Sequence, residues 1–119
     1  MKKEYDIFWN DKRIKKSEEI GLSPIEVSIL ASIVDKETVK TSEMPRIAGV
    51  YINRLNKNWL LQADPTLVFA LGDFEIKRVL DVHKEIESPY NTYKHTGLPP
   101  GPICIPSIAA IDAVLNAEQ

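Results

Sequence analysis

The sequence predicts a mainly helical α+β domain with a few short strands and an ordered proline-rich loop. Its 119 residues are enough for one domain built around one core. Several segments carry apolar residues at helical spacing, behind residues that commonly begin helices. Five of the eight prolines fall between positions 88 and 106, where they exclude a helix interior or a central strand.

The first helix is expected over residues 4–20, where the apolar side chains are only loosely periodic. Residues 7–9, Ile-Phe-Trp, would suit a short strand nearly as well, because aromatic and β-branched residues favour strands. Gly21 ends this segment.

A central helix is expected within residues 22–38. Ser23 is a good N-cap, Pro24 fits the first helical position, and Glu26 completes a capping box. At about 100° per residue, one broad apolar stripe forms, made of Leu22, Ile25, Ile29, Leu30, Ile33 and Val34. The opposite side holds Ser28, Ala31, Ser32 and Asp35.

Glu37 ends this helix and projects from the middle of the apolar stripe, three residues after Val34. Burial disfavours a charged carboxylate, and so does the negative end of the helix dipole. Both effects favour the protonated form that a general acid needs. The alternative is a last-turn acid that turns out to water, because helix ends are uncertain by a residue or two.

A third helix is expected to be capped by Thr41 or Ser42, with Pro45 in its first turn, and to end at residues 56–58. Its apolar stripe comprises Ile47, Val50, Tyr51 and Leu55. The short connection between the two helices places Glu37 at an inter-helix corner, where the edge of a cleft can form.

Residues 59–63 are too short for a helix between helix breakers and are predicted to be a strand. Asp64 is expected to cap a short helix that has Pro65 as its first residue and that Gly72 closes. A second short strand is predicted over residues 78–82.

The loop of residues 88–106 is predicted to be ordered and extended, because its prolines stiffen it. Apolar side chains give it something to pack, namely Tyr90, Tyr93, Leu98, Ile103 and Ile105. Ordered loops on a rigid scaffold often carry binding groups. A last helix is expected over residues 107–116.

Composition excludes several classes of function. The formal net charge is −2 and the pI about 5.7, which argue against a nucleic-acid-binding protein. No apolar run approaches the roughly 18 residues of a membrane span, so the chain as given is expected to be soluble. Two histidines at unrelated spacing predict no metal site. Cys104 lies between two isoleucines, where a small buried hydrophobe is the better interpretation than a catalytic thiol.

Polar residues in unusual settings suggest a sugar ligand, because amides, hydroxyls and tyrosine rings match sugar hydroxyls and C–H faces. These residues are Gln62, Asp64, Thr66 and the run Tyr90, Asn91, Thr92 and Tyr93. Simpler interpretations stay open. Asp64 can serve as a helix cap only, Gln62 can satisfy backbone groups, and Asn91 can stabilise a turn. Tyr90 and Tyr93 are better interpreted as packing of the core or the loop than as platforms for a ligand.

Five blocks occur in the order seen in the MltG (YceG-like) endolytic murein transglycosylases, a family that this chain resembles. The blocks are Ala-Ser-Ile-Val-Asp-Lys-Glu-Thr (31–38), Ile-Ala-Gly-Val-Tyr-Ile-Asn-Arg-Leu (47–55), Leu-Gln-Ala-Asp-Pro-Thr (61–66), Tyr-Asn-Thr-Tyr (90–93) and Gly-Leu-Pro-Pro-Gly-Pro-Ile (97–103). The family's second acid of a Glu-Lys-Glu-Thr block falls on Glu37. Its first acid falls on Asp35, so this sequence departs there by one methylene.

The resemblance implies that residues 1–119 form one lysozyme-like catalytic domain fragment with Glu37 as its single catalytic acid and no cofactor. It also implies a group of residues that line a glycan cleft, namely Gln62, Asp64, Thr66, Asn91 and Tyr93. The implied reaction cleaves the β-1,4 bond from N-acetylmuramic acid to N-acetylglucosamine without water and leaves 1,6-anhydro ends. The implied partners are peptidoglycan strands and, further, cell-wall synthases. Family members carry an N-terminal anchor in the cytoplasmic membrane, with this domain on the cell-wall side.

Two rival functions stay open. One is a peptidoglycan-binding module without catalysis. The other follows an older "aminodeoxychorismate lyase-like" label of the same family, which would require pyridoxal phosphate. No glycine loop suited to a phosphate is visible, because Gly97-Leu-Pro-Pro-Gly101 has prolines where backbone N–H groups would be needed.

Overall fold

Helices are the regular elements of the computed structural model, which describes residues 11–72 and 84–117. Within those residues no strand occurs, so the helical part of the predicted class is confirmed and the predicted strand at 59–63 is wrong. The predicted strand at 78–82 lies outside the described residues, and so do residues 7–9, where a strand is the alternative to the first helix. The elements are α2 (Asp11–Ile20), α3 (Pro24–Glu37), the 3₁₀ turn η1 (Thr41–Glu43), α4 (Met44–Asn56), α5 (Asp64–Leu71) and α6 (Ile108–Leu115).

Helix α3 begins where the sequence predicts. The hydroxyl of Ser23 accepts a hydrogen bond from the Glu26 backbone N–H, and the Glu26 carboxylate accepts one from the Ser23 N–H. Pro24 occupies the first turn, where a missing N–H costs nothing. This capping box depends on residues within one turn of each other, which is why the sequence alone predicts it.

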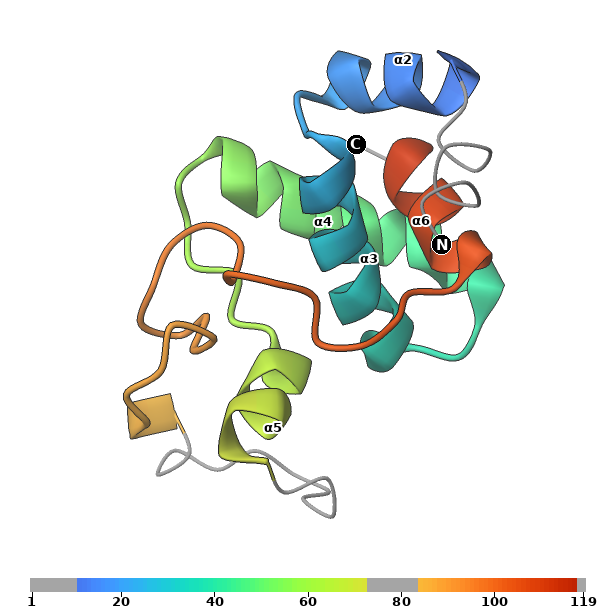
Figure 1. The fold of residues 1–119 in the computed structure, drawn as a ribbon. Helices are drawn as coiled ribbons and strands as arrows, with labels where there is room; N and C mark the ends of the chain where they lie inside the picture. Colours follow the sequence, from blue (N-terminus) through green and yellow to red (C-terminus); the bar gives the residue numbers. More distant parts are fainter. Residues whose placement is uncertain (1–10, 73–83, 118–119) are drawn as a thin grey trace.

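Helix α3 is the centre of the domain, with α2, α4, α5 and α6 packed against it (Figure 1). Ala31 and Ser32, on the side predicted to oppose the apolar stripe, are fully buried, whereas Ile25 of the stripe is 68% exposed. The end of the loop of residues 88–106 covers this side in Figure 1. There the Ser32 hydroxyl accepts a hydrogen bond from the Ile103 N–H at 3.1 Å. The predicted one-sided stripe is therefore wrong for α3, which is buried on more than one face.

Helix α4 begins later than predicted. Neither Thr41 nor Ser42 is its cap, because both belong to η1, and Glu43 stands in the cap position without a side-chain hydrogen bond to the backbone. Pro45 lies in the first turn as predicted. The buried face of α4 contains Met44, Ala48, Gly49, Tyr51 and Ile52, while Val50 of the predicted stripe is 45% exposed.

Residues 59–63 form an irregular connection that joins the loop instead of a sheet. The Gln62 N–H donates to the Thr92 carbonyl at 3.1 Å, and the Ala63 N–H donates to the Thr92 hydroxyl at 2.8 Å. Ala63 is the N-cap of α5, so Asp64 is the first helical residue and not the cap. Gly72 closes α5 in a left-handed conformation (φ +70°), as predicted.

Residues 88–106 contain no helix and no strand. They run from the side of α5 across α3 to α6 (Figure 1). The loop ends on Ser107, the N-cap of α6, whose N–H and hydroxyl both donate to the Asp35 carboxylate of α3. Among the described residues, no helix has the length and apolar character required to cross a bilayer.

Candidate active site

Glu37 is the last residue of α3 and is exposed, so the predicted burial of its carboxylate is wrong. Residues 31–34 of α3 are buried, but the last turn of the helix extends beyond the core, and residues 36 and 37 are exposed. The carboxylate is nevertheless held, because the Tyr51 hydroxyl donates a hydrogen bond to Glu37 Oε2 at 3.2 Å. The structure thus places Glu37 at the surface with one fixed contact.

A cavity of about 380 Å³ lies beside Glu37. It forms between the end of α3, η1, α4 and the connection of residues 59–63, at the inter-helix corner that the sequence predicts for a cleft edge. Its lining residues are Glu37, Thr38, Glu43, Ile47, Val50, Tyr51, Arg54 and Gln62.

Tyr51 of α4 lies beneath this cavity with only 6% of its surface exposed. Burial raises the pKa of its phenol, and the negative charge of Glu37 raises it further. Tyr51 therefore remains a neutral hydrogen-bond donor to the carboxylate. The Arg54 guanidinium lies 5.9 Å from the Tyr51 ring centroid, and it also donates a hydrogen bond to the Leu61 carbonyl.

Gln62 reaches the cavity from a strained backbone position, with a φ of +53°. Non-glycine residues adopt this conformation rarely, and they keep it where neighbouring contacts hold the chain. The two hydrogen bonds from residues 62 and 63 to Thr92 are such contacts. The exposed side chain of Gln62 is therefore presented by an ordered backbone.

Asp64 and Tyr93 form a second pair of an acid and a tyrosine, because the Tyr93 hydroxyl donates a hydrogen bond to Asp64 Oδ1. Burial, followed by the contact with Asp64, raises the pKa of Tyr93 to about 12. The charges of Glu37 and Arg54 also act on Tyr93, and Asp64 acts on Tyr51. Asp64 and Tyr93 are not among the residues that line the cavity at Glu37, so this influence of charge is the link between the two pairs.

Thr66 and Asn91, which the sequence predicts as cleft residues, are fully buried. The Thr66 hydroxyl bonds with that of Thr92 at 2.9 Å and donates to the Ala63 carbonyl at 2.7 Å. The Asn91 amide donates to the carbonyls of residues 84 and 86 and accepts from the Tyr93 N–H. Both residues therefore stabilise the loop of residues 88–106 and its contact with residues 63–66 through buried hydrogen bonds. Neither lines the cavity.

Sequence reasoning missed three residues of this region, Glu43, Tyr51 and Arg54, as members of the site, and it named Thr92 only within the polar run of residues 90–93. Apolar spacing assigns Tyr51 only to a stripe, although its hydroxyl is a polar group that needs a partner when the ring is buried. Arg54 lies one helical turn from position 51, so the two share a face of α4. No sequence signal pairs Thr92 with residue 63, because 29 positions separate them.

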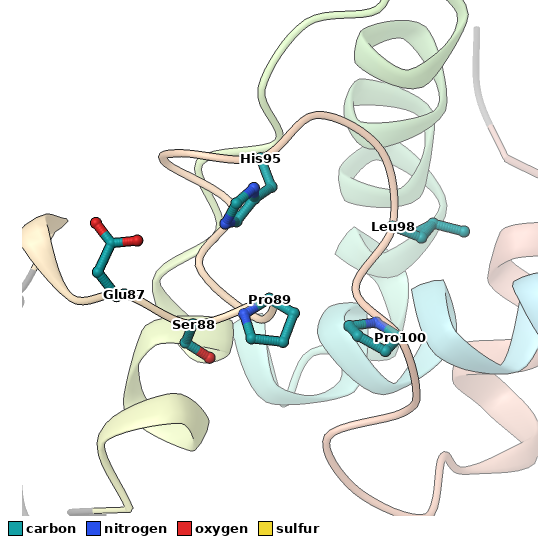
Figure 2. Close-up of a pocket in the computed structure, with 6 residues that line it drawn as sticks. All are labelled: Glu87, Ser88, Pro89, His95, Leu98 and Pro100. Carbon is teal, nitrogen blue, oxygen red and sulfur yellow. The ribbon is translucent and has the colours of Figure 1, made fainter.

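A second, larger cavity of about 530 Å³ lies against the loop of residues 88–106 (Figure 2). Its lining residues are Glu87, Ser88, Pro89, His95, Leu98 and Pro100. The Glu87 carboxylate is ion-paired with the Lys94 ammonium, which lowers the pKa of Glu87. Of the residues that the sequence predicts for the site, Glu37 and Gln62 line the first cavity and none lines this one, so the cavity at Glu37 is the better candidate.

Comparisons with known proteins agree on one family. The whole chain, residues 1–119, matches the model of the YceG-like family. It is 42% identical over 90 residues to an endolytic murein transglycosylase of Bacillus subtilis, covering 76% of this chain and 25% of that protein. It is 39% identical over 103 residues to an endolytic murein transglycosylase of Streptococcus pneumoniae, covering 83% of this chain and 19% of that protein.

A solved structure is also similar. The 2.6 Å crystal structure of a yceG-like protein of Listeria monocytogenes has a TM-score of 0.81 and 36% sequence identity, over 92% of this chain and 36% of that one. The chain spans a quarter or less of the length of the two transglycosylases it matches. Family model, relatives and fold together show that the chain belongs to the YceG-like family.

Proposed function

We propose that this chain is the catalytic domain of an endolytic lytic transglycosylase of peptidoglycan, with a lysozyme-like arrangement of its site. The observation that carries the proposal is the placement of Glu37 at the edge of a cavity, where the Tyr51 hydroxyl donates a hydrogen bond to its carboxylate. The charge of Glu37 also acts on Tyr93, which is hydrogen-bonded to Asp64. The names of the relatives support the same substrate.

The proposed reaction needs one acid. Glu37 donates its proton to the glycosidic oxygen as the bond from C1 of N-acetylmuramic acid breaks. The C6 hydroxyl of the same sugar attacks C1 and closes the 1,6-anhydro ring, and its proton returns to Glu37. Ordinary glycosidases place a second carboxylate for water or for covalent attack. Here the substrate supplies the nucleophile, so bonds and protons balance with Glu37 alone.

Gln62, Asp64 and Tyr93 are the proposed contacts to the glycan. Gln62 offers an amide at the cavity, and the Asp64–Tyr93 pair offers a carboxylate and an aromatic ring, groups that match sugar hydroxyls and C–H faces. We assign Thr66 and Asn91 to holding these residues in place. Proton transfer contributes roughly 10²–10⁴-fold, so binding and orientation supply the rest of the acceleration.

The whole protein is proposed to act on the cell-wall side of the cytoplasmic membrane, with peptidoglycan strands as its substrate and cell-wall synthases as further partners. This location follows from the family resemblance.

Product analysis tests the proposal. Purified peptidoglycan is digested with the full-length protein, and the masses of the fragments are measured by mass spectrometry. Chain ends of 1,6-anhydro-N-acetylmuramic acid are expected from the wild type and not from Glu37→Gln. Reducing ends would indicate a muramidase, and the absence of any product from the wild type would refute catalysis.

A peptidoglycan-binding module without catalysis is the second candidate, and the exposure of Glu37 favours it, because the side chain lies outside the water-excluded setting in which catalytic groups are most effective. Under that function, Glu37→Gln would keep both peptidoglycan binding and the cellular phenotype. Loss of the phenotype with retained binding would exclude it.

A further inference from the structure

We propose that Tyr51 is a positioning residue that holds the Glu37 carboxyl group in one orientation at the cavity and assigns its two oxygens different roles. The inference deepens the proposed function and depends on Glu37 being its acid. The carrying observation is the hydrogen bond from the Tyr51 hydroxyl to Glu37 Oε2 at 3.2 Å.

The two partners differ in how firmly they are held. Tyr51 is 6% exposed and lies in the core face of α4, where close packing restricts the movement of its ring. Glu37 is exposed and is the last residue of α3. An exposed glutamate side chain samples several rotamers unless a contact restricts it. The rigid tyrosine therefore determines where the mobile carboxyl group lies.

The hydrogen bond also distinguishes the two carboxyl oxygens. Oε2 accepts the hydrogen bond from the Tyr51 hydroxyl, so Oε1 is the oxygen left to carry the proton given to the substrate. After that proton has left, the same bond stabilises the new negative charge, because hydrogen bonds to ionised groups are the stronger ones. The raised pKa of Tyr51 keeps it a donor throughout this cycle.

Other charged groups surround the pair and must stay unchanged in any test. Glu43 of η1 lines the same cavity and accepts a hydrogen bond from Thr38. Arg54 of α4 lies over the Tyr51 ring, and Asp64 acts on Tyr51 by its charge. None of these groups donates a hydrogen bond to Glu37 among the interactions described, so Tyr51→Phe removes the observed contact without removing a charge.

The test compares Tyr51→Phe with Tyr90→Phe in the full-length protein, using peptidoglycan digestion at several pH values. Each change removes one hydroxyl, but Tyr90 packs on Phe69 at 4.8 Å between ring centroids and has no contact with Glu37. We expect Tyr51→Phe to lower kcat about tenfold, the cost of one lost hydrogen bond to a charged group. KM should change less than about twofold, because the substrate contacts remain.

The pH optimum distinguishes positioning from a structural role. Without the Tyr51 donor, ionisation of the carboxyl group is less favourable, so activity should extend to higher pH in Tyr51→Phe and not in Tyr90→Phe. Wild-type kcat with a wild-type pH profile in Tyr51→Phe would overturn the proposal, as would an equal loss in both variants.

A second measurement does not need activity. The ¹³C NMR signal of the Glu37 carboxyl carbon is followed against pH in wild type and in both variants. We expect its transition to move upward in Tyr51→Phe alone. An unmoved transition would refute the positioning of Glu37, whereas a moved transition in a protein that releases no product would refute only the proposed function.

Discussion

The hydroxyl of Thr92 provides the most direct test of how the candidate site is built. Thr92 is 2% exposed, and its hydroxyl accepts the Ala63 N–H at 2.8 Å. This bond holds the turn between two proposed glycan-binding residues, Gln62 and Asp64. Thr92→Val replaces the hydroxyl with a methyl group of similar size, so it leaves no cavity but leaves the Ala63 N–H without its partner.

The expected loss of stability follows from the Ala63 N–H. Thr66 loses its contact with the Thr92 hydroxyl at 2.9 Å but keeps its own bond to the Ala63 carbonyl at 2.7 Å, so the Ala63 N–H is the buried donor left without a partner. An unsatisfied buried donor costs roughly 1–3 kcal/mol. For a domain of this size, each kcal/mol lowers Tm by about 4 °C. We therefore expect Thr92→Val to lower Tm by about 4–12 °C.

The assay is urea and thermal unfolding of the 119-residue chain. Thr96→Val is the matched control, because Thr96 is exposed on the same loop and the same swap there should change stability by less than about 0.5 kcal/mol. The m-value should stay constant in both variants. Equal stability of Thr92→Val and Thr96→Val would refute the view that Thr92 holds the turn.

Three further predictions concern the acid, the second tyrosine and the loop. Glu37→Gln should reduce release of 1,6-anhydro products at least roughly 10²-fold by mass spectrometry without changing Tm by more than a few degrees; substantial remaining activity would exclude Glu37 as the acid. The raised pKa of Tyr93, about 12 against 10.0, means that the folded chain binds its proton more tightly, so stability should fall as pH rises from 10 to 12. Tyr93→Phe should flatten that decline in urea titrations, and an unchanged slope would contradict the Asp64 contact. Asn91→Ala removes donors from two backbone carbonyls and should cost about 2–4 kcal/mol in urea unfolding, whereas a loss under about 0.5 kcal/mol would show that the loop does not depend on it.

Local features of the fold were predictable from the sequence. Ser23 and Glu26 lie three positions apart and close the capping box between themselves. Gly72 ends α5 because its left-handed φ of +70° is accessible to glycine at little cost. Interactions of this kind need no information from distant parts of the chain. The resemblance further predicted Glu37 as the candidate acid, which stays a prediction.

Tertiary structure decided what surrounds each candidate residue. Glu37 is exposed although it continues the spacing of a buried stripe, because the core ends before the helix does. Ser32 is buried because a loop 71 residues further along the chain covers it. Tyr51 meets Glu37 only because α3 and α4 cross at that corner. Periodicity shows which residues share a face, but packing between distant segments determines what each face meets, and the charge and contacts of a site depend on that.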